Sequence, residues 1–155
     1  MNGVTRSVDS VRGILERELQ PLIEDWLHRV EHEPELARIQ LNYEERTGHL
    51  PHLLNDVIAR LRMGAGTKAP ISQAAAHHGD LRRKQGYTVA MAVEESRLLQ
   101  VSIFTMLHKH IKNLEFESLL PDIVTIADEV DAQLKEQMLR FMAADAAAKS
   151  ETPSS

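Results

Sequence analysis

The fold of this chain is decided by the stretch His77-His78-Gly79-Asp80-Leu81-Arg82-Arg83-Lys84-Gln85-Gly86-Tyr87, followed in the next helical segment by Glu94-Glu95-Ser96-Arg97-Leu98-Leu99. The first part is typical of the end of a helix, because Gly86 is placed to stop that helix in a left-handed backbone conformation. Thr88 is a suitable cap for the helix that follows. The stretch therefore predicts two consecutive antiparallel helices joined by a tight reversal.

Charged side chains in this stretch fall on otherwise apolar helix faces. His78 and Arg82 are four residues apart, so they share one face of the first helix. Glu95 has apolar neighbours at helical spacing in the second helix. Because an unpaired buried charge is strongly destabilising, we expect Arg82 to pair with Glu95 beside His78. Glu94 and Arg97, three residues apart, are expected to pair on the neighbouring strip.

Three interpretations of this polar group are open from the sequence. The simplest is a clamp, since buried ionic groups often fix the packing of helices without any ligand. Alternatively, the group lines a small polar pocket for an anion or another ligand. His78 adds a third interpretation, a switch that responds to pH near neutrality.

The amino-terminal half is patterned as helices separated by proline and glycine. Apolar residues recur every three or four positions over residues 8–30, which predicts an amphipathic helix that Pro21 kinks or divides. Ser7 is a plausible cap for it. Asn42 and Glu45 have the spacing of a capping box. Residues 50–61 carry the next apolar stripe, and the glycines and prolines of residues 63–70 predict a loop.

The carboxy-terminal half is expected to contain the two longest helices. Ser72 caps the helix that ends at Gly86, and the next helix is predicted from Thr88 to about Asn113. Its apolar residues surround most of its circumference, which is typical of a central helix. Pro121 is expected to open the last helix, whose apolar stripe continues to Phe141.

These patterns predict an all-α protein: a single compact helical bundle of about five helices longer than two turns, with two long final helices. Residues 1–7 are expected to be frayed, residues 8–142 to form the domain, and residues 143–155 to form a disordered polar tail. A globin-like packing without haem is the alternative architecture.

Composition excludes several classes of function. The 155 residues include no cysteine, which excludes disulfides, thiolate metal sites and cysteine nucleophiles. The net charge of −5 and the aromatic content of 4% argue against a nucleic-acid partner.

No apolar run approaches the length of a membrane span, and the first residues lack the apolar core of a signal peptide. His28 and His32 have metal-ligand spacing, but surface histidines explain them as well, so no metal site is expected. A cytoplasmic location is expected.

The spaced residues of the central stretch resemble the amino-terminal domain family of RsbRD, an RsbT co-antagonist. The residues that carry the resemblance are His78, Gly79, Arg82, Gly86, Tyr87, Glu95 and Arg97. A looser match extends to Leu50-Pro51-x-Leu53-Leu54 and to the opening helix with Trp26. The resemblance implies an all-helical sensory or regulatory input module in bacterial stress or two-component-type signalling. By this resemblance, the same seven residues are expected to form a polar core or a ligand cluster.

The resulting expectation is a non-enzymatic regulatory domain. Family members usually precede an output domain, and none is expected after the last helix of this sequence, so the signal is expected to pass through a protein partner that carries the output, or through a homodimer. No catalytic triad, phosphate loop or dinucleotide motif is present to predict an enzyme. No cofactor is expected. The alternative is a globin-like sensor that binds haem or a small ligand, with His77 or His78 as the iron ligand.

Overall fold

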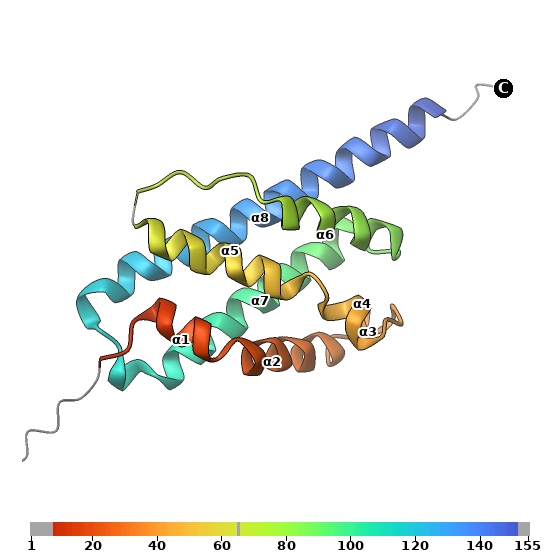
Figure 1. Ribbon diagram of the computed structural model, residues 1–155. Helices are drawn as coiled ribbons and strands as arrows, with labels where there is room; N and C mark the ends of the chain where they lie inside the picture. Colours follow the sequence, from red (N-terminus) through yellow and green to blue (C-terminus); the bar gives the residue numbers. More distant parts are fainter. Residues whose placement is uncertain (1–7, 65, 152–155) are drawn as a thin grey trace, which may run out of the picture.

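The chain is helical throughout the computed structural model, which describes residues 8–64 and 66–151 (Figure 1). No strand forms within those residues, where the extended contacts amount to an isolated parallel bridge between Asp9 and Leu114. The elements in order are α1 (Val11–Arg17), α2 (Leu19–Glu31), α3 (Pro34–Ala37), α4 (Tyr43–Thr47), α5 (Leu50–Met63), α6 (Gln73–Lys84), α7 (Val89–Lys109), the 3-10 turn η1 (Ile111–Asn113) and α8 (Phe116–Glu151). The all-α fold class is confirmed.

Five of these helices, α2, α5, α6, α7 and α8, exceed two turns, as predicted, and α7 and α8 are the longest. Helix α8 packs along α5 and α6, while α2 packs against α7. Figure 1 shows the carboxy-terminal part of α8 extending beyond the other helices. Within the described ranges, no helix combines the length and the apolarity that crossing a membrane requires.

Side-chain caps fix where the helices begin. The predicted capping box is present at α4, where Asn42 accepts from the Glu45 amide at 2.8 Å and Glu45 accepts from the Asn42 amide at 3.1 Å. Ser72 caps α6 and Thr88 caps α7, as predicted. Ser10 caps α1 by accepting from the Gly13 amide at 2.9 Å. The predicted cap Ser7 lies outside the described residues.

The first predicted helix is divided, which is one of the two outcomes expected from Pro21. Helix α1 ends at Arg17 and α2 begins at Leu19. Pro21 lacks the N–H that would bond to the Arg17 carbonyl, and its ring excludes that carbonyl from a continuous helix. The break at Glu18 removes this conflict and leaves Pro21 in the first turn of α2, where an amide has no helical partner in any case.

Two predictions about the last helix are wrong. Helix α8 begins at Phe116, so Pro121 lies inside the helix and does not open it. The helix also continues to Glu151, so residues 143–151 are not part of a disordered tail, while residues 152–155 of the predicted tail lie outside the described residues. The run Ala143-Ala144-Asp145-Ala146-Ala147-Ala148-Lys149 has strong helix propensity, which sustains the helix where the apolar stripe has ended.

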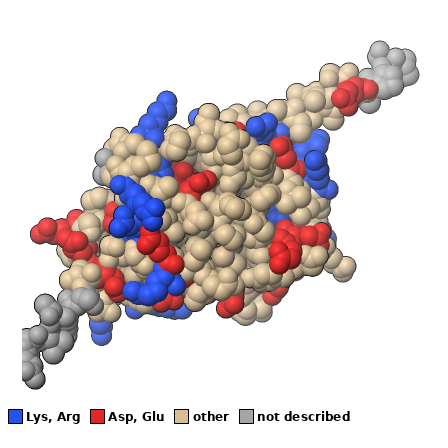
Figure 2. Space-filling model, in the orientation of Figure 1, with Lys and Arg blue, Asp and Glu red and all other residues tan. Residues whose placement is uncertain are grey.

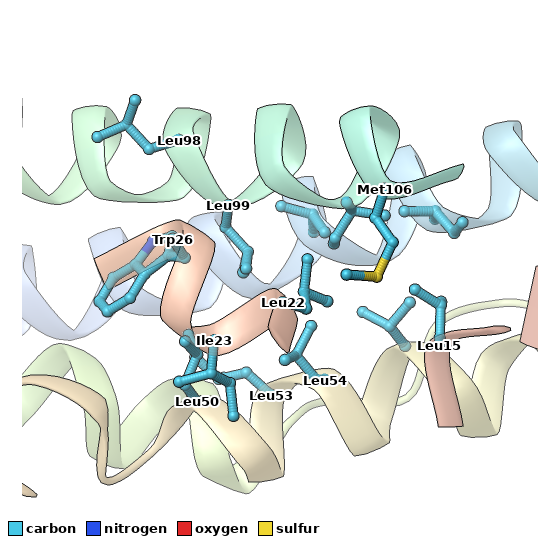
Figure 3. Close-up of a cluster of buried hydrophobic side chains, with 14 of the residues drawn as sticks. Leu15, Leu22, Ile23, Trp26, Leu50, Leu53, Leu54, Leu98, Leu99 and Met106 are labelled. Atoms are coloured by element: carbon cyan, nitrogen blue, oxygen red, sulfur yellow. The ribbon is translucent and has the colours of Figure 1, made fainter. Parts of the chain in front are cut away.

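The core lies between α7 on one side and α2 and α5 on the other (Figure 3). Leu99 and Met106 of α7 face Leu22 of α2 and the labelled leucines of α5 in this view, with the Trp26 indole beside them. Trp26 is fully buried. The core therefore holds α2, α5 and α7 together directly beneath the polar residues described below.

Acidic and basic side chains alternate on the face shown in Figure 2, with an uncharged band between the two ends. The basic middle of the chain meets the acidic last third through Arg60–Asp128 at 2.8 Å and Arg83–Asp145 at 3.0 Å. The Arg83–Asp145 pair is partly exposed, and exposed pairs of this kind contribute little to stability individually.

Candidate functional site

The buried carboxylate of Glu95 is the centre of the candidate site. Its side chain is 5% exposed. His78 Nε2 and Arg82 Nε each lie 2.9 Å from Glu95 Oε1, and the Tyr87 hydroxyl donates to Oε2 at 2.6 Å. Burial by itself would raise the pKa of Glu95. The hydrogen bond from His78 and the charge of Arg82 outweigh burial and lower the pKa to about 2. The predicted Arg82–Glu95 pair is therefore present, buried and ionised.

Arg82 uses its whole guanidinium to join three elements. The side chain is 1% exposed. Beyond Glu95 on α7, its Nη1 donates to the Glu45 carbonyl at 3.0 Å and to Gln85 Oε1 at 2.7 Å, and its Nη2 donates to the Arg46 carbonyl at 2.5 Å. Both carbonyls belong to α4. A planar group with five N–H donors suits this arrangement, and lysine could not reproduce it.

Tyr87 and Arg46 form the second layer of contacts. Arg46 Nη1 donates to the Tyr87 hydroxyl, and Arg46 Nη2 donates to the Ile39 carbonyl at 2.6 Å. The Arg82 guanidinium lies over the Tyr87 ring, 4.9 Å from its centroid, which is a cation–π contact. Burial, followed by the Glu95 charge, raises the pKa of Tyr87, so its hydroxyl keeps its proton and remains a donor.

Two histidines extend the site toward α5. His49 Nδ1 and His78 Nδ1 are 3.3 Å apart. Burial is the largest cause that lowers the pKa of both residues, to about 4 for His49, so both rings are neutral at neutral pH. With His78 Nε2–H donating to Glu95, its Nδ1 is an acceptor, and His49 Nδ1–H must be the donor to it. We name His49, Arg46, His78, Arg82, Tyr87 and Glu95 the polar cluster.

The two glycines of the predicted site shape the backbone around the polar cluster. Gly86 has φ +94°, and the amides of Tyr87 and Gly86 bond to the carbonyls of Arg82 and Arg83 at 3.0 and 3.1 Å. These two bonds are a Schellman motif, which reverses the chain as expected. Gly79 lies against α8: a Cβ there would be 2.9 Å from Gln137 Cα. The glycine therefore permits close approach of α6 and α8.

Substituting Gly79 with alanine tests that close approach. In an ordinary helix interior the change would stabilise by about 0.5–1 kcal/mol. Here the backbone of Gln137 blocks the new methyl group, so we expect Gly79→Ala to lower the free energy of unfolding by about 1–3 kcal/mol in urea denaturation. Lys84→Ala, at an exposed position of the same helix, is the control, with an expected change within about 0.5 kcal/mol. Stabilisation by Gly79→Ala would contradict the packing.

One predicted member lies outside the cluster, and two members were not predicted. Arg97 is 57% exposed and pairs with Glu94 through Nε at 3.0 Å, so the predicted Glu94–Arg97 pair is confirmed but Arg97 does not belong to the buried site. Arg46 and His49 were missed. Arg46 lies in a five-residue helix without enough turns to show a face, and His49 precedes α5. Only the tertiary fold brings them to Glu95.

The structure shows how His77 and His78, the alternative haem ligands, are placed to bind iron. Both ring nitrogens of His78 are engaged, one with Glu95 and one with His49, which leaves none for iron. His77 is exposed at the rim of a separate cavity. No group of three metal-ligating side chains able to hold an ion occurs in residues 8–64 and 66–151. The cavity that touches His78 and Glu95 has about 20 Å³, room for a single water molecule.

The pH dependence of stability reports on the neutral histidines. Because the folded-state pKa of His49 is about 4 against 6.5 ordinarily, the unfolded chain takes up a proton first, and stability is lost as the pH falls from 6.5 toward 4. Glu95 contributes stability that is complete above 4.5 and lost as the pH falls toward about 2.

We therefore expect His49→Gln to lose less stability than the native protein between about pH 6.5 and about pH 4, measured by chemical denaturation at each pH. Taking the difference between the two proteins cancels the titration of groups that do not interact with His49. Parallel curves for the two proteins would contradict a buried neutral His49.

Fold and site together define an all-helical bundle in which α4, α6 and α7 are joined by a buried, hydrogen-bonded ionic cluster. No protein-family model matches the chain, and no curated protein or solved structure is similar enough to it to count as a match. The resemblance to the RsbRD amino-terminal family therefore stays a prediction from the residues of the polar cluster and its turn.

Proposed function

We propose that this chain is a non-enzymatic, cytoplasmic sensory or regulatory domain of the RsbRD amino-terminal type, acting in bacterial stress or two-component-type signalling. The observation that carries the proposal is the Glu95 carboxylate, which receives hydrogen bonds from His78, Arg82 and Tyr87 in the interior of the bundle. Its partners come from α6 and from the turn between α6 and α7.

Such a cluster supports a regulatory role through its energetics. Burying ions is costly, and apolar replacements are often as stable or more so, so stability alone does not account for it. The cluster instead makes the packing of α4, α6 and α7 conditional on one set of bonds. Movement of α6 would break the contacts of Arg82 with α4 and with Glu95 together, which favours two discrete packings over gradual deformation.

The same geometry supports a non-enzymatic role. The Glu95 carboxylate, the Arg82 guanidinium and the His78 imidazole bond to one another, to neighbouring side chains or to backbone carbonyls. The cavity that touches Glu95 has about 20 Å³, which leaves no room for an organic substrate. A general acid or base needs reach to a substrate proton. These groups are committed to internal bonds.

The signal is proposed to leave the domain through a protein partner or a second copy of this chain. Phe116, Leu120 and Val124 recur every four residues on α8 and are 85%, 71% and 66% exposed. Side chains at this spacing form one stripe along the helix. An exposed apolar stripe of this kind supports contact with another protein.

The test replaces Glu95 with glutamine in the chromosomal copy of the source organism. Glu95→Gln keeps the side-chain shape but removes the charge that holds Arg82. We expect the stress-induced transcript profile to change as it does on deletion of the whole coding sequence. Glu94→Gln, one residue away in the surface pair with Arg97, is the matched control and should leave the profile unchanged.

Circular dichroism of the purified variants separates loss of regulation from loss of folding. If Glu95→Gln unfolds, Tyr87→Phe is used in its place, because it removes one hydrogen bond to Glu95 and leaves the Arg82 pair intact. A folded variant with the native transcript profile would contradict the proposal.

A further inference from the structure

A second cavity of about 580 Å³ opens between α5, the start of α6 and α8, and it shares the lining residue His49 with the polar cluster. Its apolar lining includes Ala59, Met63, Pro70 and Ile71. This volume falls in the range of small-molecule sites, which combine apolar walls with a few polar groups. The polar lining of this cavity is therefore the feature that decides what it binds.

Two buried charged side chains line the cavity with unused hydrogen-bonding capacity. The side chains of Arg60 and Glu129 are 5% and 2% exposed. Within the described part of the chain, Arg60 Nε, Arg60 Nη1 and Glu129 Oε2 have no hydrogen-bond partner, and Nη1 and Oε2 are 3.9 Å apart, too far for a direct bond. Buried polar atoms in native proteins are nearly always satisfied. A polar group that enters between these two side chains would satisfy both.

The remaining charges limit the ligand class. Asp56 also lines the cavity and accepts from the Ser72 hydroxyl at 2.5 Å, and Asp128 binds Arg60 from the exposed side at 2.8 Å. Burial raises the pKa of Glu129 to about 7, so Glu129 is ionised in only part of the molecules at neutral pH. A purely anionic ligand would approach the Asp56 carboxylate, and ionised Glu129, with the same sign of charge. A purely cationic ligand would leave the Arg60 donors without an acceptor. A ligand with one positive and one negative group would pair with the carboxylates and also supply an acceptor for the Arg60 donors.

We propose that this cavity binds a small zwitterion of the amino-acid type, with its carboxylate toward Arg60, its ammonium group toward Glu129 and Asp56, and an apolar side chain against Met63, Pro70 and Ile71. The inference rests on the proposed function, because the bound zwitterion would be the signal that the regulatory domain detects. Both charges of the ligand meet side chains already held in place by α5 and α8.

His49 connects this cavity to the polar cluster. It lines the cavity and, through its Nδ1, contacts His78, which in turn bonds to Glu95. A ligand that displaces His49 alters the hydrogen bonding of His78 and so the contact between α6 and α7. The cavity and the cluster are thereby two sites joined by one pair of imidazoles, which is the physical connection that coupling requires.

The experiment titrates the purified full chain with L-valine, L-leucine, L-methionine and L-phenylalanine and follows the amide chemical shifts in NMR spectra. Each amino acid is added up to roughly 10 mM, which is ten times the concentration that half-saturates a site of 1 mM affinity. We expect at least one amino acid to shift the amides of the cavity residues. For L-leucine the matched analogues are 4-methylpentanoate, which lacks the ammonium group, and 3-methylbutylamine, which lacks the carboxylate. The corresponding analogues serve if another amino acid binds best. Each analogue should bind about tenfold more weakly or worse.

Ala59→Trp and Asn55→Trp provide the matched pair of variants. Both positions are exposed on α5, but only Ala59 lines the cavity, so only Ala59→Trp should abolish binding.

Absence of binding by all four amino acids would overturn the ligand assignment, as would equal binding of an analogue with one charge. Native affinity in Ala59→Trp would overturn the site. None of these results touches the proposed function, which the transcript profile of Glu95→Gln tests without any ligand.

Discussion

Replacing Arg82 with alanine is expected to lower the free energy of unfolding by about 3–5 kcal/mol. The substitution leaves the Glu95 carboxylate buried without its cation, and it removes the donors that reach the Glu45 and Arg46 carbonyls. Urea denaturation followed by circular dichroism measures the change.

The adjacent residue provides the control for charge and helix propensity. Arg83 is also an α6 arginine with an acidic partner, but its pair with Asp145 is 35% and 58% exposed. Arg83→Ala should therefore cost no more than about 1 kcal/mol. Equal effects of the two substitutions would show that burial of the Arg82–Glu95 pair does not contribute to the free energy of unfolding. A double-mutant cycle with Glu95→Gln then isolates the coupling between the two residues.

Replacing Trp26 with alanine is expected to destabilise the protein by about 3–5 kcal/mol. The indole is fully buried, and its Nε1–H donates to the Glu95 backbone carbonyl at 3.2 Å. The substitution therefore opens a void beneath the polar cluster and removes the indole N–H that donates to the Glu95 carbonyl.

Trp26→Phe separates the two contributions, because it restores much of the buried volume but not the N–H donor. We expect it to recover more than half of the loss, since packing outweighs one neutral hydrogen bond. The readout is circular dichroism, because Trp26 is the single tryptophan and its removal also removes the fluorescence probe. Equal losses in the two variants would contradict a packing role for the indole.

Features set by short sequence spacing were predictable. The all-α class, the caps Asn42, Ser72 and Thr88, and the reversal at Gly86 follow from patterns that span one or two helical turns. The Arg82–Glu95 pair followed from the cost of leaving either charge unpaired between apolar faces joined by a tight turn.

Features set by the packing of distant segments were not predictable. Arg46 and His49 reach the cluster from α4 and from the start of α5, far from Glu95 in sequence. Arg97 was placed with the cluster by the family resemblance alone, although its spacing from Glu94 indicated a separate pair on the neighbouring strip of the helix. The cavity around Arg60 and Glu129 likewise required the juxtaposition of α5 and α8, which no local pattern encodes.

The contact of Gly79 with Gln137 has a mechanical consequence. Helix α6 touches the backbone of α8 at Gln137 and pairs with it again about two turns further on, where Arg83 lies 3.0 Å from Asp145. The two helices are thus fastened together at two points about 12 Å apart along α8. A change in the position of α6 would therefore carry the carboxy-terminal part of α8 with it, and this part extends beyond the other helices.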